Sequence, residues 1–325
     1  MLTLRCALAS RRDRDRVALE LAAELEVLGD LPEVESARLQ QITRNAAAAA
    51  SLGTVAVLSA ARDEARSILE RAEAASVRVI TAFDEGYPER LRDVSDHPAV
   101  VYLKGADLSW ERTVACVGTR SPSRFGEVVT RRLATLMAEG GWTIVSGLAL
   151  GVDALAHRAA LDAGGVTVAV LGNGLDRVFP RQNSRLASEV VAGGGALLSE
   201  QPPGTEVSRS RLVLRDRLQS GLAAAVVLLQ SDLSGGAMHT VRYALRQGRP
   251  IFAPVPTGRY AHEREARGVL AVAGATGAEL ATKLSARGEL ERLLTGELAK
   301  ERPITPIRGR EDYPALLEML ERLAS

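Results

Sequence analysis

The chain has 325 residues, of which 46% are apolar and 25% charged, and its formal net charge is +1. This composition excludes a disordered chain, and the length suffices for one large domain or two ordinary domains with hydrophobic cores. No segment has the length and apolarity of a membrane span, and the N-terminus lacks the pattern of a secretion signal. Because two cysteines make neither a disulfide framework nor a zinc site, we expect a cytoplasmic protein without membrane contact, bound metal or cofactor.

The N-terminal region is rich in Ala, Leu, Glu and Arg, and apolar residues recur there with helical spacing in 17–28 and 61–75. We therefore expect a small helical region over residues 1–78. A connector follows from 79 to 108, and its two X-Pro steps indicate turns.

The middle of the chain, residues 112–255, alternates short apolar runs with amphipathic segments of helix length. This alternation is typical of a parallel sheet covered by helices on both faces. The expected strands are 114–117, 143–145, 166–171, 196–198, 224–229 and 251–253. The expected helices are 126–139, 153–163, 183–192 and 237–247.

The fold class that follows is α/β, an extended Rossmann-like, doubly wound and mostly parallel sheet over residues 79–280. A short C-terminal helical tail is expected over 281–325. Helical spacing recurs there in 278–294 and 313–323, separated by a proline-containing linker at 303–309.

Glycine-bearing loops follow four of the expected strands, and the first comes directly after 114–117. It reads Gly118, Thr119, Arg120, Ser121 and continues into a helix that contains Phe125. Glycine lets a ligand approach the backbone, the helix N-terminus offers free N–H groups, and arginine can fork onto a phosphate. Taken alone, the loop is as compatible with an ordinary strand-to-helix turn as with phosphate binding.

The second loop begins with Ser146 and Gly147, and Asp153 and His157 follow four residues apart in the next helix. One interpretation is a catalytic acid–base pair. The favoured interpretation is structural, with a capping aspartate and a hydrogen-bonded histidine.

The third loop, after 166–171, contains a glycine pair and leads to Arg181, while the fourth, after 224–229, contains Gly235 and Gly236. Because the carboxyl ends of parallel strands share one edge of a sheet, we expect all four loops on one rim that binds an anion. The loops do not separate a nucleotide from a polynucleotide.

The positive charge is concentrated in the same part of the chain. Between residues 112 and 250, sixteen arginines accompany ten carboxylates, a formal charge of +6 that the flanking regions offset with −5. The guanidinium fork suits phosphate oxygens. Arginine-rich codon usage explains the excess equally well, since the whole chain has three lysines.

The ordered set of motifs resembles the DNA-processing protein A family, also called DprA or Smf. The segments that carry the resemblance are VACVGTRSPSRFG, IVSGLALGVDALAHRAAL, VTVAVLGNGLDRVFPRQNSRLA, GGGALLSEQPPGT and SGGAMHTVRYALRQGRPIFAPV, within roughly residues 80–280. The resemblance implies a single-stranded DNA-binding protein of natural transformation and homologous recombination. It further implies a homodimer that assists RecA loading and is not an enzyme.

By residue match, the resemblance makes Arg120 the phosphate-contacting arginine and puts Arg215 and Arg217 into the family's basic run, where Asp216 replaces the usual asparagine. That substitution places an acid in a segment expected to face DNA. The DNA- and phosphate-binding set implied is Gly118, Thr119, Arg120, Ser121, Phe125, Ser146, Gly147, Arg181, Arg215, Arg217, Gly235 and Gly236.

Two other functions stay open beside DNA binding. The related lysine-decarboxylase-like group hydrolyses nucleoside monophosphates through a P-G-G-x-G-T loop and a downstream glutamate, whereas residues 234–240 lack that proline and glutamate. A nucleotide-sensing module is the third possibility. If bases stack on the protein, Phe125, Phe179 and Tyr243 are the main candidates, although core packing is favoured for each.

Overall fold

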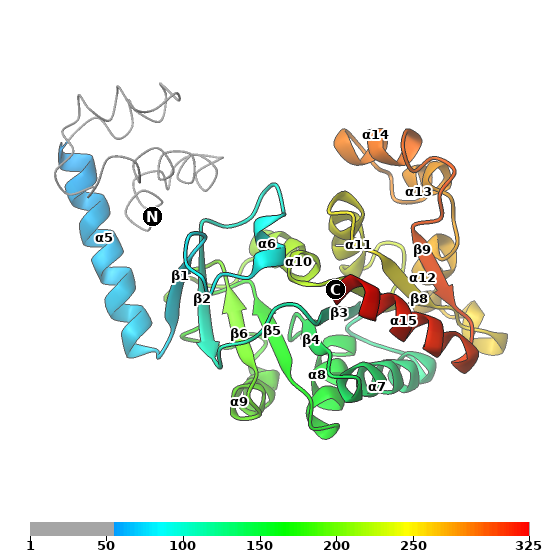
Figure 1. Ribbon diagram of the computed structural model, residues 1–325, viewed down its shortest axis with the longest axis horizontal. Helices are drawn as coiled ribbons and strands as arrows, with labels where there is room; N and C mark the ends of the chain where they lie inside the picture. Colours follow the sequence, from blue (N-terminus) through cyan, green and yellow to red (C-terminus); the bar gives the residue numbers. More distant parts are fainter. Residues whose placement is uncertain (1–54, 325) are drawn as a thin grey trace.

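One mixed sheet organises the part of the chain that the computed structural model describes, residues 55–324 (Figure 1). Within that range, nine strands run in the order β1-β2-β6-β5-β4-β3-β7-β8-β9. β1 (Arg78–Thr81) pairs antiparallel with β2 (Val100–Gly105), and β2 pairs antiparallel with β6. All neighbouring pairs from β6 to β9 are parallel, which confirms the predicted α/β, mostly parallel fold class.

The central strands lie almost wholly inside the protein, with both faces covered. Their apolar, β-branched runs suit this position, because a strand buried on both faces needs no alternating polar side chains. Each lies within one residue of its expected position. They are β3 (Thr113–Gly118), β4 (Thr143–Ser146), β5 (Thr167–Leu171), β6 (Ala196–Ser199), β7 (Ala225–Gln230) and β8 (Ile251–Pro254).

Helices cover both faces of the sheet. One face carries α7 (Arg124–Glu139), α8 (Val152–Asp162) and the C-terminal helix α15 (Tyr313–Ala324). The other face carries α10 (Arg209–Leu222) and α11 (Ala237–Arg246), while α9 (Ser184–Ala192) packs on β5 and β6. The expected helices in this region, α7, α8, α9 and α11, are all confirmed.

Helix α10 is the main element that the sequence pattern did not indicate. Its C-terminal half contains Arg215, Asp216, Arg217 and Gln219, all of them 9% exposed or less. Because these polar residues point into the protein, the helix lacks the apolar stripe and polar outer face by which a helix is recognised in sequence.

The expected linker at 303–309 contains a strand, β9 (Ile304–Ile307), which pairs parallel with β8 and extends the sheet. The prediction of a linker was wrong because Pro306 argued against a strand. Pro306 is tolerated because β9 is the last strand of the sheet, where a missing N–H can face away from the ladder.

The segments flanking the central strands are more structured than expected. The connector at 79–108 contains most of β1, all of β2 and the one-turn helix α6 (Glu89–Arg92). The helix expected over 278–294 is two helices, α13 (Gly277–Lys283) and α14 (Glu289–Thr295), separated at Gly288, whose φ is +60°.

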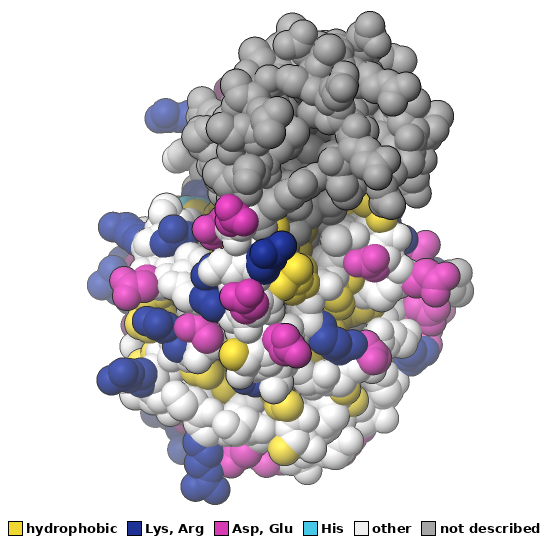
Figure 2. Space-filling model, turned by 90° about the vertical axis from the view of Figure 1, so that its left-hand side faces the viewer, with side chains coloured by type: hydrophobic (Ala, Val, Ile, Leu, Met, Phe, Trp, Pro, Cys, Tyr) yellow, Lys and Arg dark blue, Asp and Glu magenta, His cyan; other side chains and the backbone are white. Residues whose placement is uncertain are grey.

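Towards the N-terminus, α5 (Val55–Ala74) confirms the helical spacing at 61–75, whereas the expected helix at 17–28 lies outside the described residues. At the end of the molecule near β1, basic and acidic side chains are interspersed (Figure 2). No helix within residues 55–324 is long and apolar enough to cross a membrane.

Candidate functional site

The candidate site lies where the strand order reverses. From β3 the chain proceeds to β4, β5 and β6 on one side, and then returns through α10 to β7 on the other side of β3. In sheets of this kind ligands bind at the carboxyl ends of the strands beside such a reversal. The loops after β4, β3 and β7 therefore meet at the expected binding crevice, as the sequence predicted, with the loop after β5 next to them.

The loop after β3 is held by the neighbouring strand and helix. The Thr119 N–H donates to the Gln230 carbonyl at the end of β7 (2.7 Å), and the Val152 N–H of α8 donates to the Thr119 carbonyl (3.0 Å). A Cβ on Gly118 would lie 2.6 Å from a Val152 methyl, so only glycine fits there. The result is a loop fixed at its base that presents Arg120 and Ser121, both exposed, to solvent.

Gln230 connects this loop to the start of α7. Its Nε2 donates to the Ser123 hydroxyl (2.9 Å) and its Oε1 accepts from the Ser123 N–H (2.9 Å). Gly126 permits this contact, because a Cβ there would lie 2.0 Å from Gln230 Oε1. Sequence reasoning missed Gln230, although a glutamine directly after an apolar strand was the available signal. By holding Ser123, Gln230 aligns the N-terminus of α7 with the rim, and the dipole of this helix favours anions there.

The loop after β4 packs tightly rather than opening to solvent. Ser146 is buried and donates to the Cys116 carbonyl (2.7 Å), so its hydroxyl faces the sheet. The Asp153 carboxylate accepts from the N–H groups of Gly147 (3.2 Å) and Ala149 (3.3 Å). Burial raises the pKa of Asp153, while the Arg215 guanidinium and these amides oppose the shift. Asp153 thus fixes the loop and does not cap α8.

His157 is structural, as the favoured interpretation held. It is fully buried, and its Nδ1 lies 2.6 Å from the Thr167 hydroxyl. Burial, reinforced by the Arg215 charge, lowers the pKa of His157 to about 3, so the ring is neutral at physiological pH. An acid–base role for the Asp153–His157 pair does not fit these partners.

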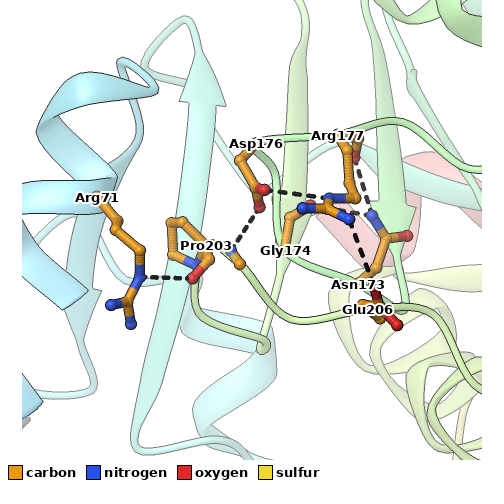
Figure 3. A network of polar contacts seen from close by, with 8 residues as sticks. Arg71, Asn173, Gly174, Asp176, Arg177, Pro203 and Glu206 are labelled. Carbon is orange, nitrogen blue, oxygen red and sulfur yellow. Dashed lines mark hydrogen bonds and ion pairs between the residues drawn. The ribbon is translucent and has the colours of Figure 1, made fainter. Parts of the chain in front are cut away.

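The loop after β5 is held by a polar network that reaches α5, the helix beside the β1 edge of the sheet (Figure 3). Asp176 Oδ1 accepts from the Gly204 N–H (2.7 Å), and Arg177 Nε lies 3.2 Å from Asp176 Oδ2. Arg71 Nε of α5 donates to the Pro203 carbonyl (3.0 Å). Although this loop is rich in glycine, its central residue Asp176 is hydrogen-bonded to Gly204 in the segment after β6.

Beyond the network, the same loop exposes two candidate residues. Phe179 is 40% exposed, and Arg181 is exposed at the start of the 3-10 turn η2 (Arg181–Asn183). Asn183 Nδ2 donates to the Leu148 carbonyl (2.8 Å), which joins η2 to the loop after β4. Arg181 therefore sits on the same rim as the loop of Arg120.

The loop after β7 completes the rim. The Gly235 N–H donates to the Asp232 carbonyl (2.9 Å), and a Cβ on Gly235 would lie 2.4 Å from the Ser231 hydroxyl oxygen. Gly236 is exposed, with open space around its Cα, and precedes α11. The Arg264 side chain holds the pKa of Asp232 below its usual range through a hydrogen bond.

Arg215 and Arg217 are not on the surface of this rim. They are 5% and 4% exposed, and their guanidinium groups bind partners inside the protein. Arg215 Nη1 donates to the Val170 carbonyl (2.5 Å), and Arg217 Nη2 donates to Glu200 Oε2 (2.6 Å). Both arginines thus brace the sheet beneath the rim loops, and the segment expected to face DNA is the buried half of α10.

A pocket of about 440 Å³ opens beside the rim, between the first turns of α7 and α8 and the start of α9. Its wall includes two arginines of a small ion-pair network, Arg158 and Arg185, which share Glu189. Other lining residues are Pro122, Gly151, Leu155 and Asn183. The pocket adjoins the Arg120 loop, because a Cβ on Gly151 would touch the Arg120 carbonyl.

Together the fold and the rim define the class of protein: a doubly wound Rossmann-like α/β protein with glycine-bearing, arginine-containing loops at its switch point. The family described as DNA recombination-mediator protein A matches residues 78–287. The match covers well over half of the sequence, and the chain belongs to this family.

Curated relatives agree with this assignment. Protein Smf of Escherichia coli (strain K12) is 40% identical over 205 residues, which are 62% of this chain and 54% of that protein. The putative DNA processing protein DprA of Mycobacterium tuberculosis (strain ATCC 25618 / H37Rv) is 34% identical over 251 residues, which are 73% of this chain and 62% of that protein. The chain spans about half to three fifths of the length of the curated relatives it matches.

Two solved structures share the fold. DNA processing protein A from Streptococcus pneumoniae superposes with a TM-score of 0.65 at 24% identity, over 96% of this chain and 95% of that one. DNA processing protein A from Helicobacter pylori, whose structure concerns its single-stranded DNA binding mode, gives a TM-score of 0.53 at 27% identity. It covers 69% of this chain and 98% of that one.

Proposed function

We propose that the chain binds single-stranded DNA along the rim formed by the loops after β5, β4, β3 and β7, and that it does so as a recombination mediator without catalysis. The observation that carries the proposal is the position of three exposed arginines, Arg120, Arg124 and Arg181, on loops and helix starts that the sheet order brings together. The Helicobacter pylori relative, described for its single-stranded DNA binding mode, supports the same ligand.

The rim suits a flexible strand better than a single nucleotide. Arg120 and Arg124 follow β3, Arg181 follows β5, and none of the three lines the pocket of about 440 Å³. This arrangement fits successive phosphates of a chain. Binding should be electrostatic and weakly dependent on sequence, because glycine amides and guanidinium groups contact phosphates rather than base edges.

A hydrolytic function has less support from the residues at the rim. Three acids in or beside the glycine-bearing loops are engaged, Asp153 and Asp176 with backbone N–H groups and Asp232 with Arg264. Dimer formation and delivery of the strand to a RecA-type recombinase are further parts of the proposal, carried by family resemblance alone.

The test is equilibrium binding of a labelled single-stranded oligonucleotide, with charge reversal at the rim. Arg120→Glu should weaken binding at least tenfold at moderate salt, because it removes one phosphate contact and adds repulsion. Three arginine–phosphate contacts predict a slope of log K against log salt of about −2, at roughly 0.7 per contact, and the variant should flatten it by about 0.7.

Arg66→Glu is the matched control, since it makes the same change of charge on an exposed face of α5, beside the β1 edge of the sheet. It should bind like the unmodified protein. Equal losses in the two variants would show that net charge, and not the rim, governs binding.

A further inference from the structure

An aromatic pair bridges two segments that lie far apart in the sequence. Phe125, in the first turn of α7, and Tyr260, in the 3-10 turn η3 (Gly258–His262), have ring centroids 5.8 Å apart with planes inclined by 34°. The Arg259 guanidinium lies over the Tyr260 ring at 4.9 Å, and its Nη2 donates to the Tyr260 hydroxyl (3.0 Å). Arginine, tyrosine and phenylalanine thus form one cluster of flat groups.

This cluster lies beside the switch point. Gly126, next to Phe125, packs on the side chain of Gln230 at the end of β7. The segment after η3 is joined to the loop after β7 by an ion pair between Arg264 and Asp232 (2.9 Å). The Gly268 N–H also donates a backbone hydrogen bond to the Ser231 carbonyl (2.8 Å), which further fixes this segment. The cluster therefore borders the crevice between β3 and β7.

Core packing does not explain Tyr260. Phe125 packs partly against the hydrophobic cluster around α7, but Tyr260 belongs to none of the hydrophobic clusters formed by residues 55–324. Its ring is only partly buried, and the adjacent Arg259 is exposed. The exposed Arg259 guanidinium over the Tyr260 ring gives the cluster a flat outer surface on which another flat group can stack.

We propose that Tyr260, supported by Phe125 and Arg259, is a nucleobase-stacking subsite for a strand whose phosphates lie on the Arg120 loop. The inference rests on the proposed binding of single-stranded DNA and adds a place where a base is held. Aromatic faces beside a basic rim are the usual means of holding single strands without reading sequence, and arginine adds cation–π attraction. The subsite accepts any base and should favour none strongly.

The test compares two ligands on the full chain: an oligo(dT) strand and an abasic deoxyribose-phosphate strand of the same length and charge. Tyr260→Ala should weaken binding of oligo(dT) by about five- to 150-fold, the range for loss of one stacked base. It should leave binding of the abasic strand within twofold. Tyr260→Phe, which keeps the ring, should bind both strands like the unmodified protein.

Tyr313→Ala is the control, because Tyr313 is also a partly buried tyrosine and lines a pocket together with two arginines, Arg131 and Arg310. It should change neither affinity. The inference is overturned if Tyr260→Ala binds oligo(dT) normally, if it weakens both strands equally, or if the selective loss appears in Tyr313→Ala instead. If the unmodified protein binds neither strand, the proposed function itself fails.

Discussion

Replacing Asp216 by asparagine should change how the stability of the protein depends on pH. Asp216 is 9% exposed in α10, and burial raises its pKa from 3.8 to about 6, against the opposing charge of Arg215. Gln219 Nε2 donates to Asp216 Oδ1 (2.9 Å), a contact that the amide oxygen of asparagine can keep. The substitution therefore removes the ionisation and preserves most of the packing.

The sign and size of the effect follow from linkage. Because the folded pKa lies above the unfolded value, the folded protein binds more protons than the unfolded chain between about pH 4 and pH 6. The stability that Asp216 contributes is thus present below pH 4 and lost as the pH rises through 6. A shift of about 2 pKa units corresponds to about 3 kcal/mol of unfolding free energy. The Asp216→Asn protein has no carboxylate at this position and would not lose this free energy as the pH rises.

The assay is urea unfolding of both proteins between pH 4 and pH 7. The difference in unfolding free energy, Asp216→Asn minus the unmodified protein, should grow by about 2.5 kcal/mol over this range, because part of the effect is already present at pH 4. Titrating groups that are not coupled to Asp216, such as His157, are present in both proteins and cancel in the difference. A difference that stays constant with pH, or that grows as the pH falls, would refute the reasoning.

Three further substitutions test how the rim is held. Gly147→Ala should destabilise the protein by about 2 kcal/mol in urea unfolding, because the new Cβ would lie 1.9 Å from Arg215 Nη1. Gly236→Ala, in open space at a φ of −57°, should cost less than about 0.5 kcal/mol, and equal effects would contradict this packing. Asp176→Ala should lower stability by about 1 kcal/mol and speed hydrogen exchange at the Gly204 N–H, whereas unchanged exchange would show that the Asp176–Gly204 bond does not hold the loop.

The sequence predicted the central sheet because each central strand can be recognised from its own residues alone. The runs that became β3, β5 and β7 each contain four or five consecutive apolar residues, and each is followed by a glycine-bearing loop. The placement of those loops on one rim then followed from the topology of parallel sheets. This part of the prediction needed no knowledge of side-chain contacts.

The parts that the sequence did not reveal depend on contacts between distant residues. The polar run of α10 reads as surface, yet Arg217 is neutralised by Glu200, seventeen residues earlier in the chain. Likewise Tyr260 stands in a charged segment without periodicity, and its contact with Phe125 arises only through the fold. Charged side chains near a motif are therefore a poor guide to which arginines reach a ligand.

The central claim, a rim that holds a single strand, is tested most directly by competition on the full chain. A labelled single-stranded oligonucleotide bound to the protein would be titrated with unlabelled single strand, blunt duplex of the same length, and nucleoside monophosphates. The account predicts displacement by the single strand at far lower concentration than by either competitor. Displacement by a monophosphate or by duplex at the same concentration as the single strand would contradict it.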